Sequence, residues 1–332
     1  VYTITPIYDG NEDCEGTPYT YTVTVNPLTG VSFIDDIVVC NGDFINNIEF
    51  TSTTQGGETT YEWVATGDDI GLDQTDDGSG LISGFTADNI SLEPLVASIT
   101  VTPTFTNGGV SSEGDPLTFT ITVNPTAQVD LVDSLDLCNG DTAVVDFTTS
   151  NGGVDSVTTY SWEITDGDSV FASAALTGAG NINLPVANDT NADLVATVTV
   201  TPTYTNDGVD CTGPSEEFTI TVSPTAQVDQ VDDIVVCNGD EVAEIVFATT
   251  SENDIAYSWS IDTEIGTQSL TGVGNIPLFE ADNDTNDPIV AIVTVTPSND
   301  ETDPSLTCEG SSIEFTITVN PTAQVDLVDS LD

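Results

Sequence analysis

The chain of 332 residues contains no lysine, arginine, histidine or methionine, and it carries 56 aspartates and glutamates for a formal net charge of −56. No ion pair between side chains can form without a cationic side chain, and trypsin has no site to cut. A charge of this size repels nucleic acid and anionic lipid, so we expect neither as a partner. Self-repulsion is relieved by salt, by divalent cations, or by spreading the charge along an extended body.

The same absences exclude most kinds of catalytic site. General acid–base catalysis usually employs histidine or lysine, and a nucleophilic serine or cysteine would have no histidine as its base. A zinc site of cysteine and histidine is excluded, and no cysteines are spaced as CxxC. A glycosidase with two carboxylates remains chemically possible, but it would have to lie in a generic repeat. We therefore expect no enzyme.

Long apolar runs are also absent. No stretch of about 18 apolar residues occurs, so no membrane insertion is expected in this segment. The apolar content of 38% and the alternation of Val, Ile, Thr, Phe and Tyr argue against disorder. Val1 begins within a strand pattern with no signal peptide before it, so we expect a fragment of a longer protein.

Internal repeats organise the chain. The block Pro-Thr-Ala-Gln-Val-Asp recurs at residues 125, 224 and 321, and a diverged copy opens at Pro27. Three tryptophans and three Cys-Asn-Gly-Asp tetrapeptides keep the same period: Trp63, Trp162, Trp259, and the turns starting at Cys40, Cys138 and Cys237. We predict the end of a truncated repeat at 1–26, full repeats at 27–124, 125–223 and 224–320, and the start of another at 321–332.

Each repeat has the pattern of an all-β domain. In the second, a first strand or strand pair is expected over 127–137, and further strands over 142–148, 159–164, 194–204 and 217–222, with clusters of Gly, Asn and Asp between them. No segment has a helical period. About 100 residues, some seven short strands and one buried tryptophan fit an immunoglobulin-like sandwich. The predicted fold class is all-β, with tandem immunoglobulin-like sandwiches in an extended array and the tryptophans as core residues rather than sugar platforms.

Several phrases carry a resemblance to a known family. They are Val-Thr-Val-Thr-Pro-Thr-Tyr-Thr (198–205), Asp-Cys-Thr-Gly (210–213), Glu-Phe-Thr-Ile-Thr-Val-Ser-Pro (217–224), Val-Val-Cys-Asn-Gly-Asp (235–240) and Tyr-Ser-Trp (160–162). The whole chain resembles the PKD-like repeats of very large Bacteroidetes surface proteins, the group that includes flavobacterial gliding adhesins. The resemblance implies export by the type IX system, display outside the cell at the bacterial surface, and a stalk or adhesive role.

Two cysteine positions recur. The early position holds Cys40, Cys138 and Cys237, and the late position, in the final hairpin, holds Cys14, Cys211 and Cys308 but Ser112 in the first full repeat. Disulfides form in extracellular proteins, although free buried thiols are a further reading. Pairing within a repeat gives Cys138–Cys211 and Cys237–Cys308. Pairing each late cysteine with the next early one gives Cys14–Cys40 and Cys211–Cys237.

A third scheme joins an early cysteine to the late one of the following repeat, as Cys40–Cys211 and Cys138–Cys308, and leaves no visible orphan. In an immunoglobulin-like sandwich the two positions lie at opposite ends, roughly 30 Å apart at about 3.3 Å per residue. A disulfide requires Cα atoms within about 7 Å. The lower end of one domain does adjoin the upper end of the next, so we prefer this interdomain pairing and keep the intradomain one as the alternative.

Acidic and hydroxylated loops supply the remaining candidates. Ca²⁺ takes six to eight oxygen ligands, so it is a possible cofactor at the domain joints. The candidate ligands are Asp141, Asp189, Asp193, Asp240, Asp282, Asp284 and Asp287, and the other reading is a solvated acidic surface. Sequons of the Asn-x-Ser/Thr type begin at Asn89, Asn188 and Asn283. The resemblance implies an O-glycosylation pattern in which Asp is followed by Ser or Thr and then by an apolar residue. The candidate sites with this pattern are Ser134, Thr142, Ser156, Ser169 and Ser330.

The leading functional hypothesis is a structural stalk that holds an adhesive region away from the cell, with neighbouring repeats of the same chain as its partners. Two alternatives stay open. The repeats themselves could bind polysaccharide or a surface, or separate chains could polymerise into a filament. Edge strands rich in Thr and Asp should resist lateral pairing, which favours the stalk.

Overall fold

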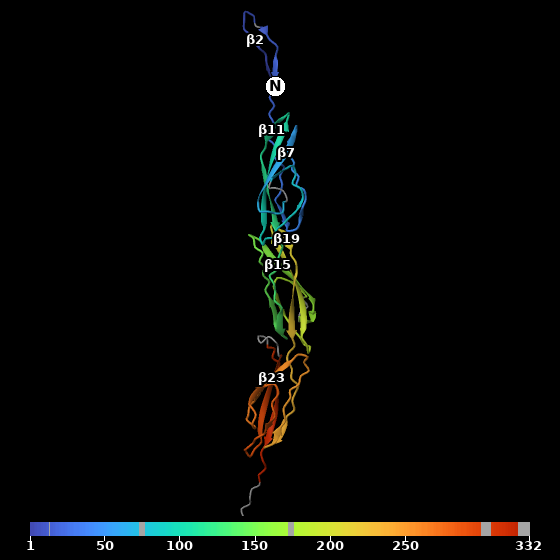
Figure 1. The fold of residues 1–332 in the computed structure, drawn as a ribbon, viewed down its shortest axis with the longest axis vertical. Coiled ribbons are helices and arrows are strands. Elements are labelled where there is room, and N and C mark those ends of the chain that lie inside the picture. The colour runs from blue at the N-terminus through green and yellow to red at the C-terminus, as the bar shows by residue number, and fades with distance from the viewer. Residues whose placement is uncertain (13, 73–76, 172–175, 300–306, 325–332) are drawn as a thin grey trace, which may run out of the picture. The chain divides into compact units, whose positions relative to one another are not determined.

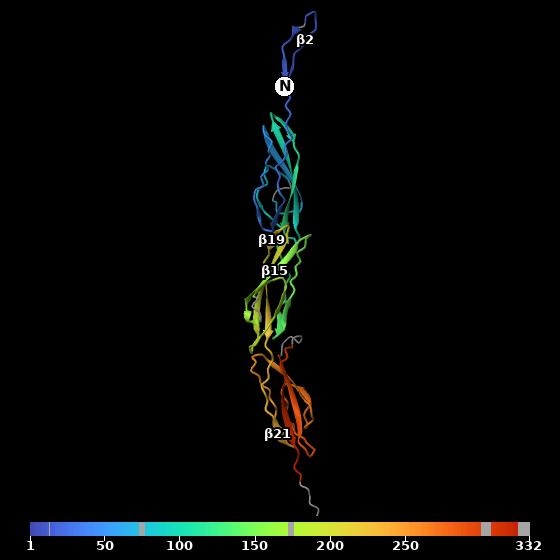
Figure 2. The same cartoon turned by 180° about the vertical axis from the view of Figure 1, so that it is seen from behind.

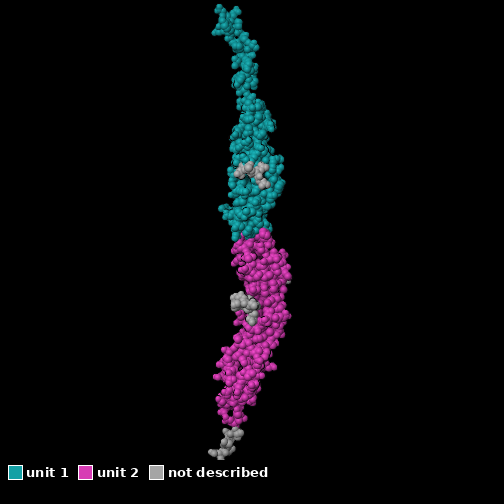
Figure 3. Space-filling view, viewed as in Figure 1, with its two compact units in different colours: residues 1–128, 150–158, 203–213 teal, residues 129–149, 159–202, 214–332 magenta. Residues whose placement is uncertain are grey.

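The computed structural model describes residues 1–12, 14–72, 77–171, 176–299 and 307–324. The chain divides into two compact units, shown in Figure 3. Unit 1 consists of residues 1–128, 150–158 and 203–213, and unit 2 of residues 129–149, 159–202 and 214–332. Within the described residues, no helix has the length and apolar character needed to cross a membrane.

Unit 1 opens with two small two-stranded sheets (Figure 1). Strand β1 (Tyr2–Ile4) pairs antiparallel with β4 (Tyr19–Tyr21), and β2 (Ile7–Tyr8) pairs antiparallel with β3 (Cys14–Glu15). Their side chains are exposed along the whole length of these strands.

A β-sandwich follows in unit 1. Its main sheet has the order β5-β12-β10-β7-β8, and β11 pairs with β10. The bounds are β5 (Ile37–Cys40), β7 (Glu58–Gly67), β8 (Asp77–Ser79), β10 (Leu95–Asn107), β11 (Val110–Glu113) and β12 (Leu117–Asn124). A second sheet pairs β6 (Phe44–Ile45) with β9 (Phe85–Thr86). Ile45 and Phe85 from that sheet share one core with Ile99 and Ile121 of the main sheet.

Unit 2 contains two further sandwiches, seen from behind in Figure 2. Their main sheets have the orders β13-β20-β18-β15-β16 and β21-β27-β26-β23-β24. The first is built from β13 (Leu135–Cys138), β15 (Val157–Asp166), β16 (Thr177–Ala179), β18 (Leu194–Asn206) and β20 (Glu216–Ser223). The second is built from β21 (Ile234–Cys237), β23 (Ile255–Ile261), β24 (Thr271–Val273), β26 (Ile289–Asn299) and β27 (Ile313–Asn320).

Short strand pairs complete these sandwiches. Strand β14 (Thr142–Val145) pairs with β17 (Ile182–Pro185), and β22 (Glu241–Val242) pairs with β25 (Phe279–Glu280). A 3-10 turn, η1, covers Asp168–Val170. The end of β18 and its partner β19 (Val209–Thr212) form a hairpin that belongs to unit 1.

Alternating side chains explain why these segments are strands. Along β18, Ala196, Val198 and Val200 are fully buried, while the threonines between them face outward and keep the β preference of a branched side chain. Burying one such aliphatic side chain contributes about 1.5–3 kcal/mol relative to leaving it exposed. Three large cores result within the described residues, built from residues 31–123, 129–222 and 228–319.

Each core contains one tryptophan opposite a glycine. Trp63 pairs across strands with Gly78, Trp162 with Gly178, and Trp259 with Gly272. The tryptophans are 1%, 7% and 5% exposed. A Cβ added at any of the three glycines would overlap the indole, so the ring occupies the space that a side chain would need.

The fold is all-β, as the sequence predicts, and consists of tandem β-sandwiches. Two expected strands are wrong in extent: a strand forms at Leu135–Cys138 where 127–137 is predicted, and β14 ends at Val145 where the prediction runs to 148. The first difference has a clear cause. The preceding backbone bonds to an irregular loop instead: Asp130 N donates to Thr148 O (2.8 Å) and Gln128 N donates to Asn151 Oδ1 (2.7 Å). The repeat boundaries stay a prediction, and residues 325–332 of the predicted last segment lie outside the described residues.

Candidate functional site at the cysteine turns

The Cys-Asn-Gly-Asp tetrapeptides form one kind of tight turn at the end of β5, β13 and β21. In the first, Cys40 N donates to Asp43 Oδ2 (3.0 Å), and the same bond measures 2.9 Å from Cys138 to Asp141 and from Cys237 to Asp240. The glycine of each turn has a positive φ, +86° at Gly42, which side chains other than glycine rarely adopt. The turn thus needs its glycine and its aspartate.

A buried asparagine anchors each turn to the end of the sandwich. Asn89 is 1% exposed, and its Nδ2 donates to Val123 O (2.7 Å) and Glu93 O (2.9 Å). Its backbone N donates to Oδ1 of Asn41 in the cysteine turn (2.8 Å). Asn188 and Asn283 make the equivalent bonds in the other two sandwiches. We call each set of cysteine turn and buried asparagine a socket.

In unit 1 the socket at Cys40 holds the hairpin of β18 and β19. Cys40 is joined to Cys211 by a disulfide with its Cα atoms 5.5 Å apart, and Cys211 is 3% exposed. Tyr204, the cross-strand partner of Cys211, is 1% exposed and clusters with Ala127 and Cys211. Its hydroxyl donates to Gly152 O (2.8 Å), and burial raises the pKa of the Tyr204 phenol. The hairpin is therefore held covalently, by packing and by hydrogen bonds.

Backbone and amide groups add polar contacts at the same place. Gly152 N donates to Leu92 O (2.9 Å), next to the Asn89 turn. Asn206 Nδ2, at the tip of the hairpin, donates to Oδ1 of buried Asn124 (2.8 Å). Buried polar groups cost free energy unless they are paired, so these contacts fix how the hairpin sits on the socket.

Unit 2 repeats this arrangement with other residues. Cys138 is joined to Cys308 with Cα atoms 5.4 Å apart, and Cys308 is 3% exposed. Glu252 N donates to Asn191 O (2.7 Å), as Gly152 does to Leu92 in unit 1. Asn299, which is 4% exposed, donates from Nδ2 to Pro224 O (3.0 Å). The same kind of joint therefore occurs twice. Tyr204 lies beside the disulfide in unit 1, and Asn299 lies beside it in unit 2.

These two bonds join an early cysteine to the late cysteine of the following predicted repeat. The intradomain alternative, Cys138–Cys211 and Cys237–Cys308, is not the one that the structure contains. Cys14 and Cys237 are exposed and free.

The candidate calcium ligands are exposed, and three of them act as hydrogen-bond acceptors. Asp141 and Asp240 close the cysteine turns, and Asp193 Oδ1 accepts from Asn253 Nδ2 (2.7 Å). Asp189, Asp282, Asp284 and Asp287 lie in the turns around the buried asparagines. Among described residues, no three side chains of Cys, Asp and Glu gather closely enough to hold a metal ion. Calcium stays a prediction.

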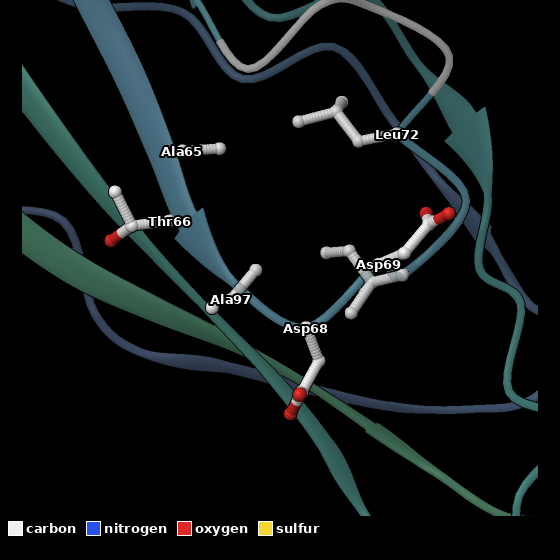
Figure 4. Close-up of a pocket in the computed structure, with 8 residues that line it drawn as sticks. Ala65, Thr66, Asp68, Asp69, Leu72 and Ala97 are labelled. Atoms are coloured by element: carbon white, nitrogen blue, oxygen red, sulfur yellow. The ribbon is translucent and has the colours of Figure 1, made fainter.

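A cavity of about 460 Å³ lies beside the end of β7 (Figure 4). Asp68 and Asp69 line it and project in different directions from their loop. Asp68 Oδ2 accepts from Val96 N (2.8 Å), and Asp69 Oδ1 accepts from Gly71 N (3.1 Å). Both carboxylates therefore hold the loop, and they do not converge on a ligand.

The glycosylation candidates differ in accessibility. Ser134, Thr142 and Ser169 are exposed, whereas Ser156 is half-buried and its hydroxyl donates to Gly153 O (3.0 Å). Ser330 lies outside the described residues. The sequon asparagines Asn89, Asn188 and Asn283 are at most 2% exposed and use both amide hydrogens internally, so the sequon here is a structural turn.

A family model described as a PKD-like domain matches residues 1–29. No curated protein matches the chain. Among solved structures, the human Desmocollin-1 ectodomain is 12% identical with a TM-score of 0.30, covering 88% of this chain and 61% of that one. Human CDH23 EC21-23 is 16% identical with a TM-score of 0.36, covering 89% and 100%. Protocadherin Gamma B2 domains 3-6 are 11% identical with a TM-score of 0.38, covering 96% and 83%.

The family-model match supports a repeat of the PKD-like type at residues 1–29. The chain spans 61% of the Desmocollin-1 ectodomain that it matches.

Proposed function

We propose that this chain is a structural segment of a very large extracellular bacterial surface adhesin, a stalk that holds an adhesive region away from the cell. The observation that carries the proposal is the joint, in which a socket and a hairpin from the following predicted repeat are joined by a disulfide at two successive places. Disulfides persist in oxidising compartments, which supports a location outside the cell. A chain without His, Lys or Arg suits this passive role and not catalysis.

The disulfides overlap along the chain, and this gives the stalk three covalent paths through disulfides between Cys40 and Cys308. One bond spans 171 residues from Cys40 to Cys211, and the other spans 170 from Cys138 to Cys308. The shortest path crosses both bonds: it runs from Cys40 to Cys211, back along the chain to Cys138, and on to Cys308. The segments 41–137 and 212–307 lie outside this path, so their unfolding would not lengthen the oxidised chain beyond it.

Single-molecule pulling tests this role. The full chain carrying C14S and C237S is stretched from its ends to full extension, with and without reductant. Reduction should release the two segments outside the shortest path, from Cys40 to Cys138 and from Cys211 to Cys308. At about 3.3–3.6 Å per residue, these roughly 195 residues give a gain in length on the order of 650 Å. The variant lacking all six cysteines is the control, and reductant should not change its extension.

Other pairings give other lengths. An intradomain Cys138–Cys211 bond hides less than half as many residues as the two interdomain bonds together. C237S removes the second intradomain bond, so the gain on reduction would then be less than half as large. No gain in length on reduction would contradict the proposal, because a stalk without joined repeats has no covalent protection against stretching.

A further inference from the structure

Beside the tryptophan of each sandwich, the edge of the main sheet is hollowed into a cavity that the indole and the opposite glycine both line. In all three sandwiches the indole Nε1 is buried and has no hydrogen-bond partner among the described residues. Buried donors are nearly always paired, so each N–H lacks a partner that water or a ligand would supply. In the first two cavities carboxylates share the wall, namely Glu62 and Asp77 beside Trp63, and Glu163 beside Trp162.

The cavity at Trp259 is different, because none of the residues that line it is acidic. Acidic residues make up 56 of the 332 in the chain, and a neutral wall sets this cavity apart from those of the other two tryptophans. Its volume of about 390 Å³ lies within the range of roughly 300–1,000 Å³ for small-molecule sites. The third sandwich therefore has a neutral cavity of ligand size in a strongly acidic protein.

Gln268 adds further unpaired groups to the wall. Both of its amide atoms, Nε2 and Oε1, are buried without a hydrogen-bond partner among the described residues. Neighbouring polar side chains are already used: Ser269 Oγ donates to Thr271 O (2.8 Å), and Asn275 Oδ1 accepts from Phe247 N (3.3 Å). Leaving a buried amide unpaired costs free energy, which a ligand that pairs with it recovers. Together with the indole N–H, the cavity offers two unused donor groups and one unused acceptor.

Apolar side chains form much of the remaining wall. Phe279 is 3% exposed and belongs to the core, whereas Leu278 is 62% and Val273 83% exposed. Small-molecule sites commonly combine such apolar surface with a few polar groups that fix the orientation of the ligand. Leu278 and Val273 are thus apolar surface that a bound ligand would cover.

Charge and hydrogen bonding narrow the class of ligand. An anion is repelled by the net charge of −56, and no cationic side chain can hold it. A bare cation would meet two N–H donor groups and no carboxylate at this wall. A hydroxyl both accepts and donates, so it can accept from the Trp259 indole and donate to Gln268 Oε1. A neutral molecule with neighbouring hydroxyls and C–H faces, such as a sugar residue, satisfies the polar groups and covers the apolar ones.

We propose that the cavity at Trp259 binds a neutral sugar residue, with the indole N–H and the Gln268 amide as its hydrogen-bonding groups and Leu278 against its C–H face. Trp259 stays a core residue, 5% exposed, and contributes only its N–H edge. These polar groups are covered in the free protein, so the Gln268 side chain rotates as the sugar enters. The site goes beyond the proposed stalk role, because it adds a binding activity that does not depend on the disulfides.

Nuclear magnetic resonance of the full chain, labelled with the heavy nitrogen isotope, measures binding at each tryptophan separately. The three indole N–H signals are assigned with single Trp→Phe variants, and glucose, galactose and N-acetylglucosamine are titrated in turn. At least one sugar should shift the Trp259 signal saturably, with a Kd on the order of 1 mM for so small a ligand. The Trp63 and Trp162 signals should stay in place. Glucuronate, which is anionic, should bind several-fold more weakly than glucose at low ionic strength.

Methyl glycosides of the same sugars distinguish the source of the ligand. Equal binding of glycoside and free sugar means that the site accepts a residue at the end of a glycan. Binding of the free sugar alone means that the anomeric hydroxyl is held as well and that the free sugar is the ligand. Both results support a sugar site.

Gln268→Ala tests the polar contacts without removing a bond printed by the fold itself, because the amide has no partner among the described residues. The variant should keep the melting temperature of the parent chain, while the Kd for the sugar rises about tenfold through the loss of one or two hydrogen bonds. Leu278→Ser, at an exposed position, should weaken binding several-fold. Gln128→Ala, at an exposed glutamine in unit 1, is the matched control and should change neither quantity.

A Trp259 signal that no neutral sugar moves would mean that the cavity holds water only, and it would overturn the proposal. Three indole signals moving together, or an unchanged Kd in Gln268→Ala, would overturn it too. None of these outcomes bears on the pulling experiment, which depends on the two disulfides, so the two proposals fail separately.

Discussion

Trp63 and Gly78 are directly opposite each other on β7 and β8, and the indole fills the space where a side chain on Gly78 would lie. The same pair recurs as Trp162 with Gly178 and Trp259 with Gly272. The nearly complete burial of these tryptophans thus depends on a glycine in the neighbouring edge strand.

Gly78→Ala should therefore destabilise its sandwich. Overpacking a filled core costs about 1–3 kcal/mol, because the indole or the strand has to move. Urea unfolding followed by tryptophan fluorescence measures this, with the Trp63 signal isolated by changing the other two tryptophans to Phe. Gly30→Ala is the matched control, since no atom lies within 4 Å of the added Cβ and φ is not positive there. Equal effects of the two changes would contradict the pairing.

Asn188→Ala should weaken the socket in unit 2. The change removes the donors to Ala192 O and Val222 O. Thr190 Oγ1 still donates to Ala192 O, but the buried Val222 carbonyl loses its donor from Asn188, at a cost of about 1–3 kcal/mol. Urea unfolding gives the free energy of unfolding, and Asn183→Ala, at an exposed position, is the control that should leave it nearly unchanged. A stable Asn188→Ala variant would show that the buried amide is not an anchor.

Acid should lower the folding stability of the first and third sandwiches, in each case through one aspartate. A hydrogen bond from Thr316 N (2.7 Å) lowers the pKa of Asp233 below its usual value of 3.8, and Thr120 N acts in the same way on Asp36. The ionised form is favoured in the folded state, so the stabilisation is present above the unfolded pKa and is lost as pH falls through the lowered folded pKa.

The second sandwich has Ser134 in this place, which accepts from Thr219 N (3.3 Å) and does not ionise in this range. Asp233→Asn should therefore flatten the decline in stability between about pH 4 and pH 2 relative to the parent chain. Urea midpoints across this range measure it. Parallel curves for variant and parent would mean that the Thr316 bond does not select the ionised form.

Calcium is tested by thermal melting after chelation and again after Ca²⁺ is added back. Binding at the turns of Asp189 and Asp193, or of Asp282, Asp284 and Asp287, should raise the melting temperature by mass action. Asp284→Asn should remove part of that gain, and Asp136→Asn, an exposed carboxylate on β13, is the control. Identical melting with and without Ca²⁺ would mean that the carboxylates are a solvated acidic surface.

The sequence was enough to predict the long strands of the sandwiches, because alternation along segments such as 194–204 and the regular spacing of the repeats depend only on local pattern. It did not predict the short strands β16, β17 and β19, which have too few residues for a pattern to be seen. It also favoured the observed cysteine pairing, since the two positions were placed at opposite ends of one sandwich. It overextended the strand over 127–137, where apolar residues alternate but the backbone finds its partners in an irregular loop.

The buried asparagines were missed as anchors and read as sequons. Their recurrence with Asn41, Asn139 and Asn238 in the cysteine turns was a signal in the sequence, but the meaning of that pairing depends on a contact between residues far apart in the chain. Tyr204 was missed because a tyrosine in an alternating strand gives no sign that Gly152 will accept its hydroxyl. Which glycine lies against an indole depends on strand register, which local pattern does not fix.

Peptide mapping without reduction tests the central claim most directly. The chain lacks trypsin sites, so an endoproteinase that cuts after acidic residues is used, with free thiols blocked beforehand. The account predicts that Cys40 is recovered with Cys211, Cys138 with Cys308, and Cys14 and Cys237 with the blocking group. Recovery of Cys138 with Cys211 and of Cys237 with Cys308 would contradict it, because each repeat would then close on itself.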